Sequence, residues 1–224
     1  MEITADHVRV ALFYVAAFVV STAVHEFGHA FVADRLGDRI PRLQGRLTLS
    51  PMAHVDPIGT LAIPLVAVLL PTIGFPLLAW GKPVQTNPAN YTRRLSRTTG
   101  HMLVAAAGPF MNLVLAVLVS IVIVVLGKTH VVSLEVLDGL FRYLVVLNIM
   151  LLFFNLIPLG PLDGATVLAG LLPPSMQRIS DLNRRYGMLV LLVLFFAHAM
   201  PVVMRPVGAL TSAWVRVIGR MVAA

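Results

Sequence analysis

The 224-residue sequence contains no cysteine. Disulfide bonds and thiolate metal sites are therefore excluded, and imidazole and carboxylate groups remain as the strong protein ligands for a transition metal. A metal site in this chain would have to be built from its 7 histidines and 10 acidic residues.

Charged residues are also scarce. They make up only 12% of the chain, whereas 58% is hydrophobic and the mean hydropathy is +0.88; in a soluble domain about a quarter of the residues are charged. This composition excludes an ordinary soluble domain, and long apolar runs without strict alternation exclude a β-barrel. We expect an all-α polytopic membrane protein with about 4–6 membrane segments. It would form a single domain over residues 1–224, with its core at 7–172.

The apolar segments of the chain are long enough, or nearly so, to cross a bilayer. They cover residues 7–33, 57–80, 101–126, 140–157 and, as an additional span, 185–204. The second segment contains Pro64, Pro71 and Pro76, which break or kink a helix. It is predicted to enter and leave on one side as a re-entrant hairpin, with a straight span as the alternative.

Basic residues predict the orientation. Loops 34–56 and 81–100 each carry 4 Lys or Arg, the latter including Arg93 and Arg94, whereas loop 127–139 carries only Lys128. By the positive-inside rule the first two loops are cytoplasmic. The loop at 159–184 then lies on the same side, so segments 7–33 and 140–157 end at one face. Although the net charge is +7, these residues form no dense basic stripe with aromatics, so no nucleic-acid partner is predicted.

Three further segments have residue patterns that predict their local structure. Residues 206–224 place Arg216 and Arg220 among apolar residues, which predicts an interfacial amphipathic helix or, equally, a basic solvated tail. Residues 43–49 alternate apolar and polar side chains, and "WGKPVQTNP" is too rich in Pro and Gly for a helix. Each of these two is predicted to supply a short edge strand near the membrane surface.

The sequence "HEFGH" follows the first apolar run. Because residues four apart share a helix face, His25 and His29 can direct two imidazoles at one ion, with Glu26 beside them. Such an arrangement suits zinc and a carboxylate that takes a proton from the attacking water. Structural bundle histidines would be the alternative, but ionisable groups inside a membrane are costly and mark functional sites.

A catalytic zinc site usually has three protein ligands, so one more is required. Asp163 is the best candidate because it follows a helix-breaking segment on the face where 7–33 also ends. Its alternative role is to cap the short helix expected at 165–172. The other candidates for the third ligand are His54, Asp56, His101 and His198.

Two polar residues each have a possible functional role and a possible structural role. His54, in a loop, is either a substrate-binding or ligand-supporting group or a surface histidine. Asn112, inside the segment at 101–126, is either a contact for the substrate or oxyanion or a hydrogen-bonding residue between helices.

Together these motifs resemble the site-2 protease family of intramembrane zinc metalloproteases, in particular its compact bacterial group without PDZ or CBS domains. The resemblance covers roughly residues 21–170, through "HEFGH", "ADRLGD", "GRLTLSPMAHVDPIGTL", "WGKPV", "AAAGPFMNLVLA" and "NLIPLGPLDG". It implies one zinc ion on His25, His29 and Asp163, with Glu26 activating water. It also implies that Asn112 and His54 lie near the scissile peptide.

The predicted function is therefore that of a zinc endopeptidase of the bacterial inner membrane. It would cut a membrane-protein substrate in or near its transmembrane segment, in regulated intramembrane proteolysis, with the active site toward the cytoplasm. Its partners would be the lipid bilayer and a transmembrane protein substrate. A zinc or proton transporter and a non-catalytic scaffold that binds membrane helices are the alternatives, since intramembrane His, Glu and Asp also line transport pathways.

Overall fold

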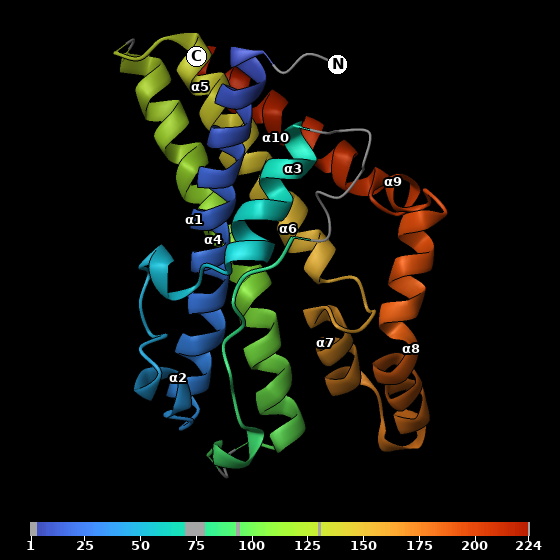
Figure 1. Ribbon diagram of the computed structural model, residues 1–224. Coiled ribbons are helices and arrows are strands. Elements are labelled where there is room, and N and C mark those ends of the chain that lie inside the picture. The colour runs from blue at the N-terminus through green and yellow to red at the C-terminus, as the bar shows by residue number, and fades with distance from the viewer. Residues whose placement is uncertain (1–3, 70–78, 93–94, 130, 224) are drawn as a thin grey trace.

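The computed structural model describes residues 4–69, 79–92, 95–129 and 131–223. The described chain is a helical bundle in which α4 packs against α1, α6 and α7, while α8 lies on the outer side of α7 (Figure 1). Its main helices are α1 (Ala5–Arg35), α2 (Ile40–Leu43), α3 (Ile63–Leu69), α4 (Arg97–Thr129), α5 (Leu134–Leu140), α6 (Leu147–Asn155), α7 (Asp163–Leu171), α8 (Gln177–Phe196), α9 (Met200–Val203) and α10 (Arg205–Ala223). Short 3₁₀ turns (Pro51–Ala53, Pro88–Asn90, Pro174–Met176) and π-helical turns (Pro57–Ala62, Phe141–Val146) link or extend them.

Three helical stretches are long and apolar enough to cross a membrane among the described residues. They are Ala5–Arg35, Arg97–Thr129 and Glu135–Asn155, with 31, 33 and 21 residues. Each exceeds the roughly 20 residues that hydrocarbon requires. The expectation of an all-α polytopic membrane protein is therefore confirmed.

Helices α1 and α4 cross closely because both carry glycine at the crossing. A Cβ on Gly28 would lie 2.6 Å from the carbonyl oxygen of Ala107, and one on Gly108 would lie 2.4 Å from Nε2 of His29. Small residues allow membrane helices to approach to this degree. The crossing holds the "HEFGH" turn against α4.

The additional span expected at 185–204 differs from the structure. Helix α8 starts earlier, at Gln177, and its first half carries Arg178, Asp181, Arg184 and Arg185, so it is not among the candidate spans. The helix ends at Phe196, and α9 begins at Met200 after a break in which His198 has a φ of 53°. The apolar second half of α8 continues a helix that begins in charged residues, and a membrane span over 185–204 stays a prediction.

The proline-rich segment at 57–80 is helical over the part that the structure describes before residue 70. Asp56 begins this part, and its carboxylate accepts hydrogen bonds from the N–H groups of Ile58 (3.0 Å) and Gly59 (2.7 Å). Residues 70–78, with Pro71 and Pro76, lie outside the described residues, as do Arg93 and Arg94 of the orientation count. A re-entrant hairpin therefore stays a prediction.

The two predicted edge strands are wrong: no residue that the structure describes is in a strand. Residues 43–49 form the end of α2 and a turn, and the described residues from 79 to 87 have no regular structure. A strand needs a neighbouring strand for its backbone hydrogen bonds. Here the N–H groups of Lys82, Val84 and Asn87 bond instead to the carbonyl of His54 and to the carboxylates of Glu26 and Asp38.

The C-terminal helix α10 covers the segment in which an amphipathic helix was predicted. Its apolar side packs on α4 and α6, with Val207 and Ile218 buried, and the indole N–H of Trp214 donates to the hydroxyl of Ser120 at 3.0 Å. Arg216 and Arg220 are exposed. Whether α10 lies in the membrane interface stays a prediction.

Candidate active site

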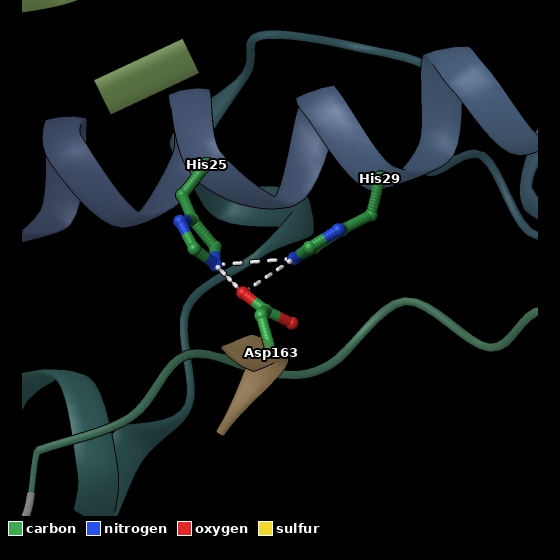
Figure 2. A group of neighbouring side chains, drawn as sticks. All are labelled: His25, His29 and Asp163. Atoms are coloured by element: carbon green, nitrogen blue, oxygen red, sulfur yellow. Dashed lines mark hydrogen bonds and ion pairs between the residues drawn. The ribbon is translucent and has the colours of Figure 1, made fainter. Parts of the chain in front are cut away.

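His25 and His29 project from one face of α1 toward the same point, as their spacing predicts (Figure 2). Their Nε2 atoms are 3.1 Å apart. Both residues lie well inside the chain, and the exposed fraction of His25 is only 8%. The helix therefore presents two imidazole nitrogens to one small volume of space.

Asp163 reaches this point from α7. Its Oδ2 atom lies 3.2 Å from Nε2 of His25 and 3.4 Å from Nε2 of His29. Asp163 is the first residue of α7, and Leu162 occupies the N-cap position without a side-chain hydrogen bond. The carboxylate of Asp163 therefore does not act as the N-cap of α7.

The loop before Asp163 is held in place from α8. The side-chain amide of Asn183 donates to the carbonyl of Pro158 at 2.9 Å, and its oxygen accepts from the N–H of Gly160 at 3.2 Å. A side chain at Gly164 would collide with the carbonyl oxygens of Leu156 and Ile157 at 2.4 Å. These contacts fix the first turn of α7 against the end of α6.

The three atoms fit the ligand set of a zinc ion. A tetrahedral zinc with N and O ligands at about 2.0–2.1 Å needs them about 3.3 Å apart, and the observed separations are 3.1, 3.2 and 3.4 Å. His25, His29 and Asp163 also form a group able to hold a metal among the described residues. The Oδ2 atom of Asp163 is buried without a hydrogen-bond partner in the described chain. A cation between the three atoms would give this buried oxygen a partner.

Hydrogen bonds on the far side of each ring set the tautomers. Nδ1 of His29 lies 2.7 Å from the carbonyl oxygen of Val104, which can only accept, so Nδ1 carries the proton. Nδ1 of His25 lies 2.7 Å from Oδ1 of Asn112. In neutral rings both Nε2 atoms then carry lone pairs, the form in which imidazole binds a metal.

The charge of Asp163 suits the same role. Burial opposes ionisation of this carboxyl, but in the metal-free chain positive charge on the adjacent imidazole of His29 outweighs burial and holds the pKa of Asp163 well below its usual range, and a zinc ion would supply that positive charge when bound. The carboxylate is therefore ionised at neutral pH and supplies a negative charge to the ligand set.

Glu26 points into the same cavity from the next position on α1. One of its carboxylate oxygens, Oε2, accepts the backbone N–H of Val84 at 2.9 Å. The segment that carries Val84 passes very close to α1, because a Cβ on Gly81 would lie 2.2 Å from the Thr22 methyl group and 3.7 Å from Cγ of Glu26. Glu26 is thus oriented from outside its own helix.

A cavity of about 930 Å³ opens onto these residues. Its lining includes His25, Glu26, His29 and Asp163, and it is otherwise mostly apolar, with side chains from α1, α6, α9 and the segment at 79–86. The site is therefore an apolar chamber with one convergent group of metal-ligating and acid–base side chains.

Comparison with known proteins decides the family. The profile of peptidase family M50 matches residues 13–136 and 129–197, more than half of the chain.

The chain belongs to peptidase family M50.

Two bacterial relatives of this M50 peptidase support the assignment. YwhC of Bacillus subtilis is 36% identical over 190 residues, covering 82% of this chain and 80% of YwhC. Rip2 of Mycolicibacterium smegmatis is 33% identical over 198 residues, covering 87% of this chain and 71% of Rip2. Both are described as "Putative zinc metalloprotease". No solved structure matches the chain.

The M50 peptidase is therefore a membrane zinc metalloendopeptidase of the site-2 protease type, and its cofactor is zinc. When bound, zinc raises the acidity of water and polarises a carbonyl group. The transporter and scaffold alternatives from the sequence do not fit this family.

Asn112 lies behind the ligands of the M50 peptidase and not beside the cavity. It is 0% exposed, and its amide nitrogen donates to the carbonyl of Ser21 at 3.3 Å and to Oδ1 of Asn148 at 2.8 Å. Asn148 in turn donates to the hydroxyl of Ser21 at 2.8 Å. Every polar atom of the Asn112 amide is occupied, so the structure favours the interhelical alternative over a substrate contact.

His54 is also buried, with 1% exposure, and does not line the catalytic cavity. Its Nε2 atom lies 2.9 Å from the carbonyl oxygen of Thr48, and its own carbonyl accepts the N–H of Lys82 at 2.9 Å. His54 therefore holds the segment that passes over Glu26. The surface-histidine alternative does not fit this burial, and direct substrate binding by the ring stays a prediction without support from its position.

The remaining candidates for the third ligand lie outside the metal group. Asp56 caps the π-helical turn at Pro57–Ala62, and His198 lies in the break between α8 and α9. His101 lines the catalytic cavity but is not one of the three converging residues.

Several residues that shape the site had no predicted role in it. Ser21 and Asn148 complete the hydrogen-bond network behind His25, Val84 orients Glu26, and Asn183 holds the loop before Asp163. Buried polar residues in apolar segments were visible as a signal for Ser21 and Asn148. The backbone N–H of Val84 leaves no signal in the sequence.

Proposed function

We propose that this chain hydrolyses a peptide bond in or near a transmembrane segment of a membrane-protein substrate, as a step of regulated intramembrane proteolysis. The observation that carries the proposal is the convergence of His25, His29 and Asp163 beside Glu26 in an apolar cavity between helices of membrane length. A soluble peptide would gain little from an apolar chamber. An apolar membrane segment matches the apolar lining of the cavity.

In the proposed mechanism His25, His29 and Asp163 hold zinc and Glu26 is the general base. Val84 fixes one oxygen of Glu26, and the other, Oε1, makes no hydrogen bond within the described residues. That oxygen takes the proton of the attacking water and passes it to the leaving amine. The hydrogen bonds that the two Nδ1–H groups donate to Asn112 Oδ1 and to the carbonyl of Val104 keep both Nδ1 atoms protonated and both rings in place throughout.

The substrate would bind in an extended form along the segment at 79–87. This segment has no partner strand in the described chain, and main-chain hydrogen bonding to an extended peptide is a common way to bind varied sequences. A helix would have to unwind locally, which also exposes the scissile carbonyl.

The basic loops support an active site that opens toward the cytoplasm in a bacterial inner membrane. Arg35 ends α1 and Arg97 begins α4, so the two loops rich in Lys and Arg lie at the end of the bundle nearest the ligands. We also propose that the whole chain, residues 1–224, acts as one integral membrane domain. The relatives that support this setting come from bacteria.

The test is cleavage of a transmembrane test substrate by purified protein in lipid vesicles. Glu26→Gln is expected to retain zinc and to lose cleavage by at least ~100-fold, because the substituted amide cannot accept the proton. Unaltered cleavage by Glu26→Gln would contradict the mechanism. Cleavage of soluble peptides alone, with no cutting of any transmembrane substrate, would contradict the proposed substrate class.

A further inference from the structure

A second hollow of about 350 Å³ lies beside the catalytic cavity, between the start of α4, α7 and the start of α8. These elements meet toward the lower end of the bundle in Figure 1, where α1 also ends. His101 lines both hollows, so the second opens directly beside the first. A peptide that leaves the catalytic cavity toward this end of the bundle would pass it.

The polar lining of the second hollow consists of two arginines, a histidine and neutral hydrogen-bonding side chains. Arg97 and His101 come from the first turns of α4, and Arg184 comes from α8. The other polar groups are Thr98, Thr166, Gln177 and Ser180, and no aspartate or glutamate is among the lining residues that the structure describes. Such a lining suits an anionic group.

The two arginines of this hollow differ in availability. Arg184 forms a 2.7 Å ion pair with Asp181, so part of its charge is neutralised. Arg97 forms no ion pair within the described part of the chain and is exposed. Arg97 is therefore more available than Arg184 to pair with an anionic ligand.

The distance from the catalytic group follows from helix geometry. Gly108, which contacts both imidazoles, is 7 positions after His101 and 11 after Arg97 in α4. At about 1.5 Å per residue, His101 and Arg97 lie about 10 and 16 Å from the site along the helix axis. An extended peptide covers about 3.3 Å per residue, so these two side chains correspond to positions about three to five residues from the scissile bond.

We propose that this hollow is a specificity site that selects substrates with an acidic side chain in that window, on the cytoplasmic side of the scissile bond. The inference rests on the proposed function and its orientation. Cytoplasmic flanks of membrane segments are usually rich in Lys and Arg. A cationic hollow repels such flanks and admits acidic ones, so it would spare most membrane proteins.

The experiment uses one transmembrane substrate with Glu, Gln or Lys in the window, and a further version with Glu several residues beyond it. The protein is reconstituted in phosphatidylcholine vesicles, and kcat/KM is measured for each version. We expect Glu in the window to exceed Lys by about tenfold, with the preference falling as salt is raised. Glu beyond the window is expected to give no gain over Gln.

Variants identify the hollow as the source of the preference. Arg97→Glu is expected to reverse the order of the Glu and Lys substrates, and Arg97→Gln to reduce the difference between them. Arg216→Glu makes the same charge change on α10, away from the hollow, and is expected to leave the order unchanged. Equal kcat/KM for Glu, Gln and Lys substrates in the unmodified protein would overturn the inference while leaving the proposed function intact.

Two other outcomes also overturn it. The assay is repeated in vesicles containing equal amounts of phosphatidylglycerol and phosphatidylcholine. If Arg97→Glu changes all substrates alike, and only with phosphatidylglycerol, the hollow binds a lipid headgroup instead. If zinc-loaded unmodified protein cuts no version of the substrate, the proposed function fails, and this inference fails with it.

Discussion

Substituting Gly108 by alanine tests whether the helix crossing sets the geometry of the metal ligands. A Cβ at this position would lie 2.4 Å from Nε2 and 2.5 Å from Cε1 of His29, and 2.7 Å from Cε1 of His25. These separations are about 1 Å shorter than an ordinary van der Waals contact. Both rings would have to shift, because they cannot keep their present positions beside a methyl group.

The expected result is a loss of both metal and activity. Displacing a catalytic group by about 1 Å costs about 100-fold in rate, which corresponds to about 2.7 kcal/mol of transition-state stabilisation. Zinc affinity should fall by about 10- to 100-fold, because the hydrogen bonds that the rings donate to Val104 and Asn112 would no longer align them. Zinc content is measured by mass spectrometry of the purified protein, and kcat/KM with a transmembrane substrate in vesicles.

A matched substitution separates this effect from a general cost of replacing glycine. Gly139→Ala also lies in a helix, but nothing is within 4 Å of its added Cβ. Zinc content and kcat/KM of Gly139→Ala should match the unmodified protein. If Gly108→Ala kept full zinc occupancy and unmodified kcat/KM, the argument that Gly108 makes room for the ligands would be refuted.

Three further substitutions test other contacts. Asn112→Leu removes the acceptor for His25 Nδ1 and should weaken zinc binding about 10- to 100-fold in a chelator competition; unchanged affinity would show that this bond does not matter. Val84→Pro removes the N–H that orients Glu26 and should lower kcat about tenfold while zinc is retained; a loss of zinc would instead indicate wider disruption. Trp214→Phe removes the bond to Ser120 and should lower the free energy of unfolding by about 0.5–1.5 kcal/mol with kcat/KM unaffected; a drop in kcat/KM would show that α10 acts on the site.

The metal group could be predicted because it depends on local geometry and on coordination chemistry. Residues four apart share a helix face, so His25 and His29 were expected to point the same way. A catalytic zinc site usually has three protein ligands, so a third residue was required. Asp163 was preferred because the chain breaks before it on the expected face. The distances now place it beside both imidazoles.

Other features depend on contacts that a sequence pattern does not contain. The role of Asn112 depends on its three partners, which come from two other helices. The segment at 79–87 was predicted as an edge strand because it is too rich in Pro and Gly for a helix, but its N–H groups bond to carbonyl and carboxylate acceptors without a paired strand. Helix α8 begins in charged residues before the apolar run, and its contact with α7 could not be seen in the sequence.

X-ray absorption at the zinc edge tests the central claim most directly. For the purified protein we expect one zinc ion per chain, with two imidazole nitrogens and a carboxylate oxygen at about 2.0–2.1 Å. In Asp163→Ala the oxygen ligand should be replaced by solvent or the zinc lost, and His25→Ala should remove the zinc. A spectrum and zinc content unchanged in Asp163→Ala would contradict the assignment of His25, His29 and Asp163 as the metal site.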